Sequence, residues 1–138
     1  MKKIIKTDQA PAPIGPYNQA VMSGNTLYIS GQIAINPVDG NLVQKDILEE
    51  TEQVMRNLKA ILQAAEMDFG NIVKTSIFIS DMNNFSQINS VYSKYFDEKT
   101  APARETVEVA NLPKFVNLEI SAIAVSYTHL TLPTKRIV

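Results

Sequence analysis

The chain has 138 residues, enough for one domain with a real hydrophobic core. It contains no cysteine, which excludes disulfide bonds, thiolate metal sites and a cysteine nucleophile. Thirteen basic and fourteen acidic side chains give a formal net charge of −1, and leaving out Lys135 and Arg136 makes the balance more acidic still. The basic excess typical of nucleic-acid-binding surfaces is missing, which argues against an RNA or DNA partner.

The only histidine is His129, close to the C-terminus. The main body therefore lacks both histidine and cysteine, which excludes Ser–His triads and His-rich metal sites there. We expect no metal and no other cofactor. No hydrophobic run reaches the length of a membrane span, and residues 1–6 lack the continuous apolar stretch of a signal peptide. These features predict a soluble, cytoplasmic protein.

Three strands are predicted first, over residues 1–6, 18–22 and 26–33. A turn at residues 23–25, Ser-Gly-Asn, joins the second strand to the third as a hairpin. In the third strand apolar and polar side chains alternate, which is typical of a half-buried strand. The alternation places Leu27, Ile29, Gly31 and Ile33 on one face and Tyr28, Ser30 and Gln32 on the other.

A long helix is predicted to begin at Asp46, which has capping-box spacing to Glu49. An apolar stripe recurs at helical spacing along it. Its members are Ile47, Thr51, Val54, Leu58, Ile61 and Ala65, broadened by Leu48, Met55 and Leu62. Glu50 and Glu52 join Glu49 near the helix N-terminus, where negative charge is favourable, and the three are interpreted as a solvated cap. The helix is expected to end between residues 67 and 70.

The remaining pattern predicts a strand over residues 72–80, a helix over 84–96, and strands over 104–109 and 118–125. The order is β-β-β-α-β-α-β-β. It indicates an α+β protomer with two helices on one face of a mixed sheet.

Both faces of the strand at 118–125 carry apolar side chains. Leu118 and Ile120 lie on one side, while Ile123 and Val125 share the other side with Glu119. Two helices cannot cover both faces of one sheet. We therefore expect a homo-oligomer in which a partner subunit covers the second face and the sites lie at subunit contacts.

Arg104 and Glu119 are the main candidates for a functional site. Of the three arginines, Arg56 is interpreted as helix surface and Arg136 lies near the C-terminus, so Arg104 alone introduces a β-type run straight after a proline. Glu119 lies just inside the most apolar segment of the chain. A guanidinium and a carboxylate in apolar surroundings suit a small carboxylate-bearing ligand, and a structural ion pair is the alternative.

Several segments resemble the RidA/YjgF family of enamine and imine deaminases, in the family's order and spacing. They are residues 12–20 (APIGPYNQA), 27–32 (LYISGQ), 73–75, 85–89, Tyr92, Phe96, 102–104 (PAR), Val107, 112–113 and 118–120 (LEI). The resemblance covers residues 1–125. It implies a chorismate-mutase-like protomer, a homotrimer around a β-barrel core, and sites in clefts between subunits. It also implies hydrolysis of 2-imino acids such as 2-iminobutanoate and 2-iminopropanoate to 2-oxo acids and ammonia, as metabolite damage control.

The resemblance also implies roles for residues. Arg104 would hold the substrate carboxylate through two parallel hydrogen bonds, and Glu119 would activate water or return a proton to the departing ammonia. The Ser30 hydroxyl and the Gly31 backbone would bind the substrate, although a sheet bulge is an equally good explanation of that glycine. Tyr17 would close a neighbouring subunit's pocket, or simply anchor its loop. Three further residues are expected to line the pocket: Phe85, Asn89 and Thr106.

Two features depart from the family pattern. Glu105 stands where a small residue is usual, and alternation along a strand should point it away from Arg104. Residues 126–138 have no counterpart in the family and are interpreted as a cloning or sequencing scar, separate from the single domain at 1–125.

Two other functions remain open. A non-catalytic sensor could hold a 2-oxo acid or a similar small carboxylate in the same cleft. An RNA-directed translation inhibitor or nuclease is a third possibility for the family, and the missing basic excess argues against it. We expect a small-molecule partner and a homotrimer, with no nucleic acid and no membrane.

Overall fold

The structure is a computed structural model that describes residues 1–127. Residues 128–138, which make up most of the predicted scar and include His129, lie outside the described part. The strands are β1 (Lys2–Ile5), β2 (Ala20–Ser23), β3 (Thr26–Gln32), β4 (Ile72–Ile79), β5 (Ala103–Glu108) and β6 (Leu118–Val125). The helices are α1 (Ile47–Ala64) and α2 (Phe85–Tyr92), with short 3-10 turns at Phe69–Asn71, Met82–Asn84, Ser93–Tyr95 and Pro113–Phe115.

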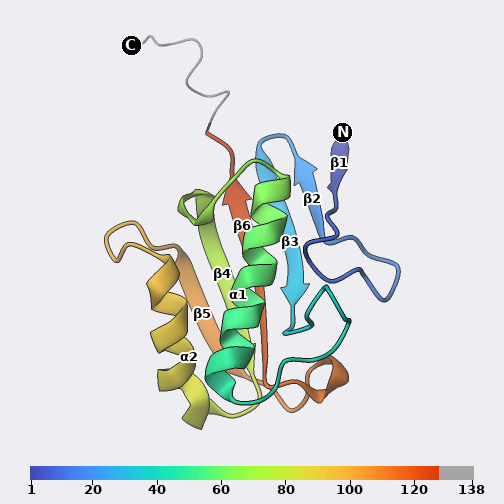
Figure 1. The fold of residues 1–138 in the computed structure, drawn as a ribbon. Helices are drawn as coiled ribbons and strands as arrows, with labels where there is room; N and C mark the ends of the chain where they lie inside the picture. The colour runs from blue at the N-terminus through green and yellow to red at the C-terminus, as the bar shows by residue number, and fades with distance from the viewer. Residues whose placement is uncertain (128–138) are drawn as a thin grey trace.

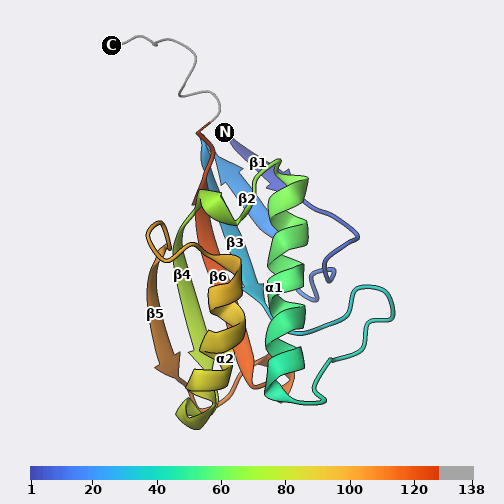
Figure 2. The same cartoon turned by 60° about the vertical axis from the view of Figure 1, so that its left-hand side comes forward.

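The six strands form one mixed sheet in the order β1-β2-β3-β6-β4-β5. Neighbouring strands are antiparallel except for the parallel pair β4 and β5. Both helices lie on the same face of the sheet (Figures 1 and 2). The predicted element order and the two-helix layer are confirmed. Among residues 1–127, neither helix combines the length and apolarity needed to span a membrane.

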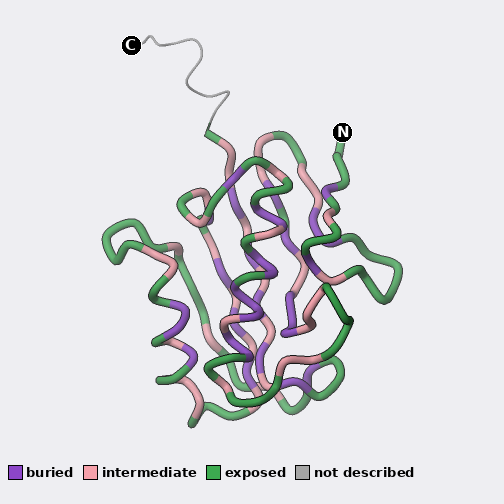
Figure 3. Tube along the Cα trace, in the orientation of Figure 1, coloured by how far each residue is buried: buried purple, intermediate pink, exposed green. Residues whose placement is uncertain are grey.

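The hydrophobic core lies between the sheet and α1 (Figure 3). From the sheet, the alternate residues of β4 and β6 are buried, including Ile77, Ile79, Leu118 and Ile120. From α1, the predicted stripe supplies Val54, Leu58 and Ile61 with Met55 and Leu62. Each fully buried aliphatic side chain contributes roughly 1.5–3 kcal/mol, so this layer supplies most of the stability of the protomer.

The second face of the sheet, called the open face here, has no helix or second sheet over it within the described chain. The strand registers align Ile4, Val21, Tyr28 and Ile123 in one row across β1, β2, β3 and β6. Tyr28 is 50% exposed and Ile4 is 38% exposed. An apolar row of this kind is typical of a protein–protein contact. Its burial by a partner subunit stays a prediction.

Both helices end earlier than predicted. α1 stops at Ala64 because Glu66 adopts a left-handed conformation with φ of 60°. The Met67 N–H then bonds to the Leu62 carbonyl at 2.9 Å, which closes a Schellman-type C-cap without the usual glycine signal. α2 ends at Tyr92 and continues only as a 3-10 turn to Tyr95.

The interpretation of the acidic residues of α1 as a solvated cap is wrong for two of them. Glu50 is fully buried. Glu52 accepts hydrogen bonds from Lys94 and from the Tyr95 hydroxyl, which ties α1 to the turn after α2. Leu48, predicted to broaden the apolar stripe, is exposed instead. The position of these two glutamates near the helix N-terminus predicted solvent exposure, whereas the structure buries one and bonds the other to the segment after α2.

Asp46 does cap α1, and its side chain accepts the Glu49 N–H at 2.8 Å. We expect Asp46→Ala to lower the free energy of unfolding by about 1 kcal/mol, because the N–H loses its partner. Chemical denaturation at fixed protein concentration measures this. Lys45→Ala is the matched control, since its ion pair with Glu49 is long (3.7 Å) and exposed. Equal losses in the two variants would contradict the capping role.

Candidate functional site

A β-bulge in β3 sets the position of Gly31. Ile29 pairs with Ala122 and Gln32 pairs with Ile120, so Ser30 and Gly31 together oppose the single residue between them on β6. The extra residue reverses the alternation. Gly31 therefore lies on the open face, not beside Leu27 and Ile29 as predicted, and Gln32 is buried.

Glu119 lies directly over Gly31. A Cβ atom added to Gly31 would come within 2.3 Å of Glu119 Oε2, so only glycine leaves room for this carboxylate. Burial raises the pKa of the Glu119 carboxyl above its ordinary value. The two explanations of Gly31 therefore both hold: it lies in a β-bulge, and it allows the close approach of another group, the Glu119 carboxylate.

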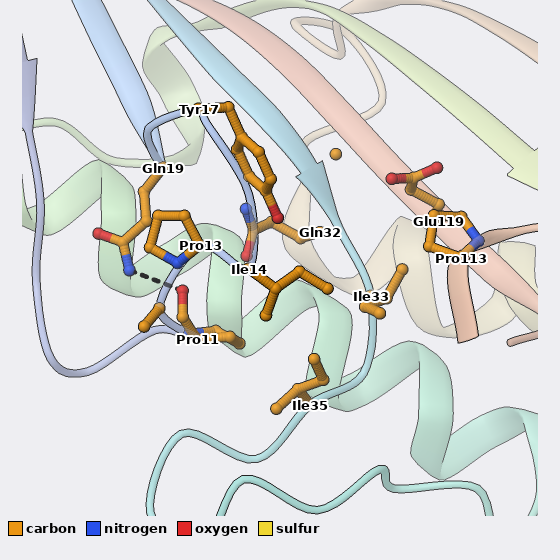
Figure 4. Close-up of a pocket in the computed structure, with 12 residues that line it drawn as sticks. Pro11, Pro13, Ile14, Tyr17, Gln19, Gln32, Ile33, Ile35, Pro113 and Glu119 are labelled. Atoms are coloured by element: carbon orange, nitrogen blue, oxygen red, sulfur yellow. Dashed lines mark hydrogen bonds between the residues drawn. The ribbon is translucent and has the colours of Figure 1, made fainter.

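The pocket at Glu119 is closed on its other side by the loop that carries Tyr17. Figure 4 shows Glu119 and Pro113 on one side of β3 and Tyr17 and Ile14 on the other. The cavity volume is about 60 Å³. Ligand sites usually enclose about 300–1,000 Å³, so this pocket is only part of a site.

Two polar side chains hold this loop in place. The Ser30 hydroxyl donates to the Asn18 carbonyl at 2.6 Å and keeps a lone pair free to accept. Gln19 is buried and bonds to the backbone of Thr7, Ala10 and Pro11. Tyr17 is left 48% exposed at the mouth of the pocket.

Arg104 is held by α2 on the opposite face of the sheet. Its guanidinium lies over the rings of Tyr92 and Phe85, 5.0 Å and 5.6 Å from their centroids, and Nη1 donates to Asn89 Oδ1 at 2.7 Å. These three residues recur at i, i+4 and i+7 of one helix face. The Tyr92 hydroxyl is itself bonded to Thr75 at 2.8 Å, so the ring is fixed. Phe85 and Asn89 therefore orient the arginine, while its remaining N–H groups can bind a ligand.

Thr106 lies beside Arg104 on β5, as predicted, and both line a shallow hollow with Phe85, Ser86 and Met82. The Thr106 Oγ1 atom is buried and has no hydrogen-bond partner among residues 1–127. A buried polar atom without a partner is costly. A group from outside this chain would satisfy it.

Arg104 and Glu119 do not meet within one chain. Arg104 pairs in register with Thr75, which faces the helices, whereas Glu119 pairs with Phe78, three residues along β4 and on the open face. The pockets at the two residues share no lining residue. A site that uses both side chains requires a second copy of the chain.

Glu105 points to the open face, away from Arg104, as predicted. It bonds to the Ser76 hydroxyl and pairs with Lys74 at 2.9 Å, and these contacts, that of Ser76 first, lower the pKa of its carboxyl. It does not neutralise Arg104. Residues 1–127 contain no cluster of three or more His, Cys, Asp or Glu side chains that could bind a metal ion.

Sequence reasoning assigned no role to Tyr92 or Gln19. The sequence shows the helical spacing of Tyr92 from Phe85 and Asn89, but it does not show that Arg104 packs against that face of the helix. Gln19 follows a proline-rich loop with free backbone groups, and its burial depends on how that loop folds back.

A family described as Endoribonuclease L-PSP matches residues 7–126. The chain belongs to this family. A RutC family protein of Pyrococcus horikoshii is 50% identical over 124 residues, which cover 90% of this chain and 98% of the relative. A mouse relative named 2-iminobutanoate/2-iminopropanoate deaminase is 47% identical over 125 residues, covering 91% and 92% of the two chains.

Solved structures of the same family have the same fold. A putative endoribonuclease from Thermotoga maritima superposes with a TM-score of 0.88 at 50% identity, covering 91% of this chain and 98% of that one. The YjgF gene product of E. coli gives a TM-score of 0.83 at 48% identity, covering 89% and 98%. The expected RidA/YjgF membership is confirmed.

The raised pKa of Glu119 predicts a gain in stability when its charge is removed. Because the folded state holds this proton more tightly than the unfolded chain, the carboxylate costs stability as pH rises above its ordinary range. We expect Glu119→Gln to raise the melting temperature at pH 7, and the gain to vanish below about pH 4.

Glu105→Gln is the matched control in the same thermal scans. Its carboxyl has a lowered pKa, so its charge contributes stability above the ordinary range of glutamate and loses it as pH falls. No gain at pH 7 is expected for this variant. A fall in melting temperature for Glu119→Gln would show that the carboxylate is not a costly group.

Proposed function

We propose that this protein hydrolyses 2-imino acids, such as 2-iminobutanoate and 2-iminopropanoate, to 2-oxo acids and ammonia. The relatives named as deaminases of these compounds support the proposal. So does an arginine that is held by Asn89 and the Tyr92 ring and whose remaining N–H groups can bind a planar carboxylate. In this proposal the enzyme needs no cofactor and acts in the cytoplasm, where it removes reactive imines.

We further propose that the site forms between two copies in a homotrimer. The observation that carries this is the separation of Arg104 and Glu119 on opposite faces of one sheet. Glu119 lines a small cavity, Arg104 lines open hollows on the other face, and the open face offers an apolar row for a partner. Contact between the open face of one copy and the β5 edge of the next would bring the two half-sites together.

The proposed reaction needs orientation and one acid–base group. Arg104 holds the carboxylate, which fixes the neighbouring C=N carbon over the Gly31 backbone. Glu119, as carboxylate, takes a proton from water while the water oxygen bonds to this carbon and the C=N π electrons move to nitrogen. Glu119 then delivers this proton to nitrogen, which gives the neutral carbinolamine. In the second step the hydroxyl proton passes through Glu119 to the same nitrogen while the C–N bond breaks, so ammonia leaves and the hydroxyl oxygen becomes the new C=O.

The environment of Glu119 suits this exchange. A carboxyl with a raised pKa is a stronger base and a better proton donor near neutral pH than an exposed glutamate. The hydroxyls of Ser30 and Thr106 can bond to the substrate, since that of Thr106 has no partner among residues 1–127, and Tyr17 can cover it.

Arg104 gives the main test. In an assay of ammonia release from 2-iminobutanoate generated by a threonine dehydratase, we expect Arg104→Ala to lower kcat/KM about 100-fold. Arg104→Lys should lower it about 10-fold, because the charge remains while the two parallel bonds are lost. Arg56→Ala, at an exposed position of α1, is the control.

Full activity in Arg104→Ala would contradict the proposed deamination at Arg104. A non-catalytic sensor is the second candidate, because both functions need Arg104 to bind the acid. Binding of 2-oxobutanoate without turnover, and no kinetic effect of Glu119→Gln, would favour that sensor. RNA binding that weakens steeply with salt would instead favour an RNA-directed activity.

A further inference from the structure

Glu50 is a buried carboxylate that the proposed reaction does not use. It lies in the first turn of α1 and is 0% exposed. Within residues 1–127 no lysine or arginine forms an ion pair with it. A buried charge without a cation is costly, so its hydrogen bonds must be specific and well made.

Both oxygens of Glu50 bind one residue. Oε2 accepts the Asn117 N–H at 2.9 Å, and Oε1 accepts Asn117 Nδ2–H at 2.8 Å. Asn117 in turn accepts the Ser80 N–H on its carbonyl at 3.1 Å and the Ser80 hydroxyl on Oδ1 at 3.3 Å. Glu50 therefore fixes the chain where β6 begins, two residues before Glu119.

The segment held in this way, residues 113–119, has a strained backbone. Lys114 and Phe115 both have left-handed backbones, with φ of 56° and 55°, although neither is glycine. Such residues persist only where the surrounding structure fixes them. Pro113 and Glu119, at the two ends of the segment, both line the pocket.

Another part of the pocket wall is also bound to α1. Asn57 Nδ2 donates to the carbonyls of Ile33 and Ile35, each at 3.0 Å, and both of these residues line the pocket. Gln53 bonds to Asn57 at 2.9 Å. Glu50, Gln53 and Asn57 thus recur at i, i+3 and i+7 as a polar stripe of α1, which attaches two segments of the pocket wall to one rigid helix.

We propose that Glu50 is a positioning residue for the proposed deamination: through Asn117 it fixes the segment that carries Glu119 over Gly31. The inference rests on the proposed function. A side chain displaced by about 1 Å can reduce the rate of an enzyme about 100-fold, so the loss should appear in kcat.

The test compares Glu50→Ala with Glu50→Gln in the imine assay. Glu50→Ala should lower kcat at least about 10-fold with little change in KM, because Arg104 still binds the carboxylate. Glu50→Gln should restore most of the rate. Its Oε1 can accept the Asn117 N–H, and the Asn117 amide can turn over because the Ser80 hydroxyl accepts as well as donates.

Thr51→Ala is the matched control for stability. Thr51 is also fully buried in α1, but its hydroxyl bonds only to the Ile47 carbonyl of the same helix. This variant should lose stability without losing kcat. Asn117→Ala removes the other partner of the same side-chain hydrogen bond. If Glu50→Ala does not fold, a fall in kcat for Asn117→Ala would support the proposal.

A measurement that needs no catalysis tests the positioning role of Glu50 independently of the proposed deamination. The carboxyl carbon of Glu119 can be titrated by NMR, and Glu50→Ala should move its midpoint toward that of an exposed glutamate, whereas Thr51→Ala should not. Lack of deamination by the wild type would overturn the proposed function alone. An unchanged Glu119 titration, or equal kcat losses in Glu50→Ala and Thr51→Ala, would overturn the positioning role.

Discussion

Side chains alternate between the two faces of a β-sheet, and this constraint governs the whole arrangement. β5 presents Arg104 toward the helices, while β6 presents Glu119 toward the open face. No rotamer can bring the two together through a packed sheet. Any chemistry that needs both must therefore come from two copies, and the exposed apolar row on the open face gives those copies a reason to associate.

The residues of the two half-sites include several features that lower the stability of the single chain. Glu119 is a carboxylate in apolar surroundings, Thr106 has a buried hydroxyl without a partner among residues 1–127, and the turn before β6 holds two left-handed residues. Each feature costs stability in the single chain. The polar stripe of α1 and the rings of α2 hold these costly groups in place, which is the expected pattern for a preorganised site.

Periodicity predicts most of the fold. The alternation of β6 and, apart from Leu48, the apolar stripe of α1 are correct because they depend on local spacing and on burial of one face. The errors arise where position depends on a distant partner. The bulge at Ser30 and Gly31 is invisible to a count of alternating residues, and Glu50 looks solvated until Asn117 is placed against it. The separation of Arg104 from Glu119 likewise depends on strand order, which local patterns do not fix.

The most direct test of a shared site mixes two inactive variants. Arg104→Ala and Glu119→Gln would be denatured together in equal amounts and refolded, and their imine hydrolysis compared with each variant refolded alone. If every site takes Arg104 from one copy and Glu119 from the next, about a quarter of the sites regain both residues and about a quarter of wild-type activity should return. Activity no higher than that of the separate variants would show that the two residues do not act in one site between copies.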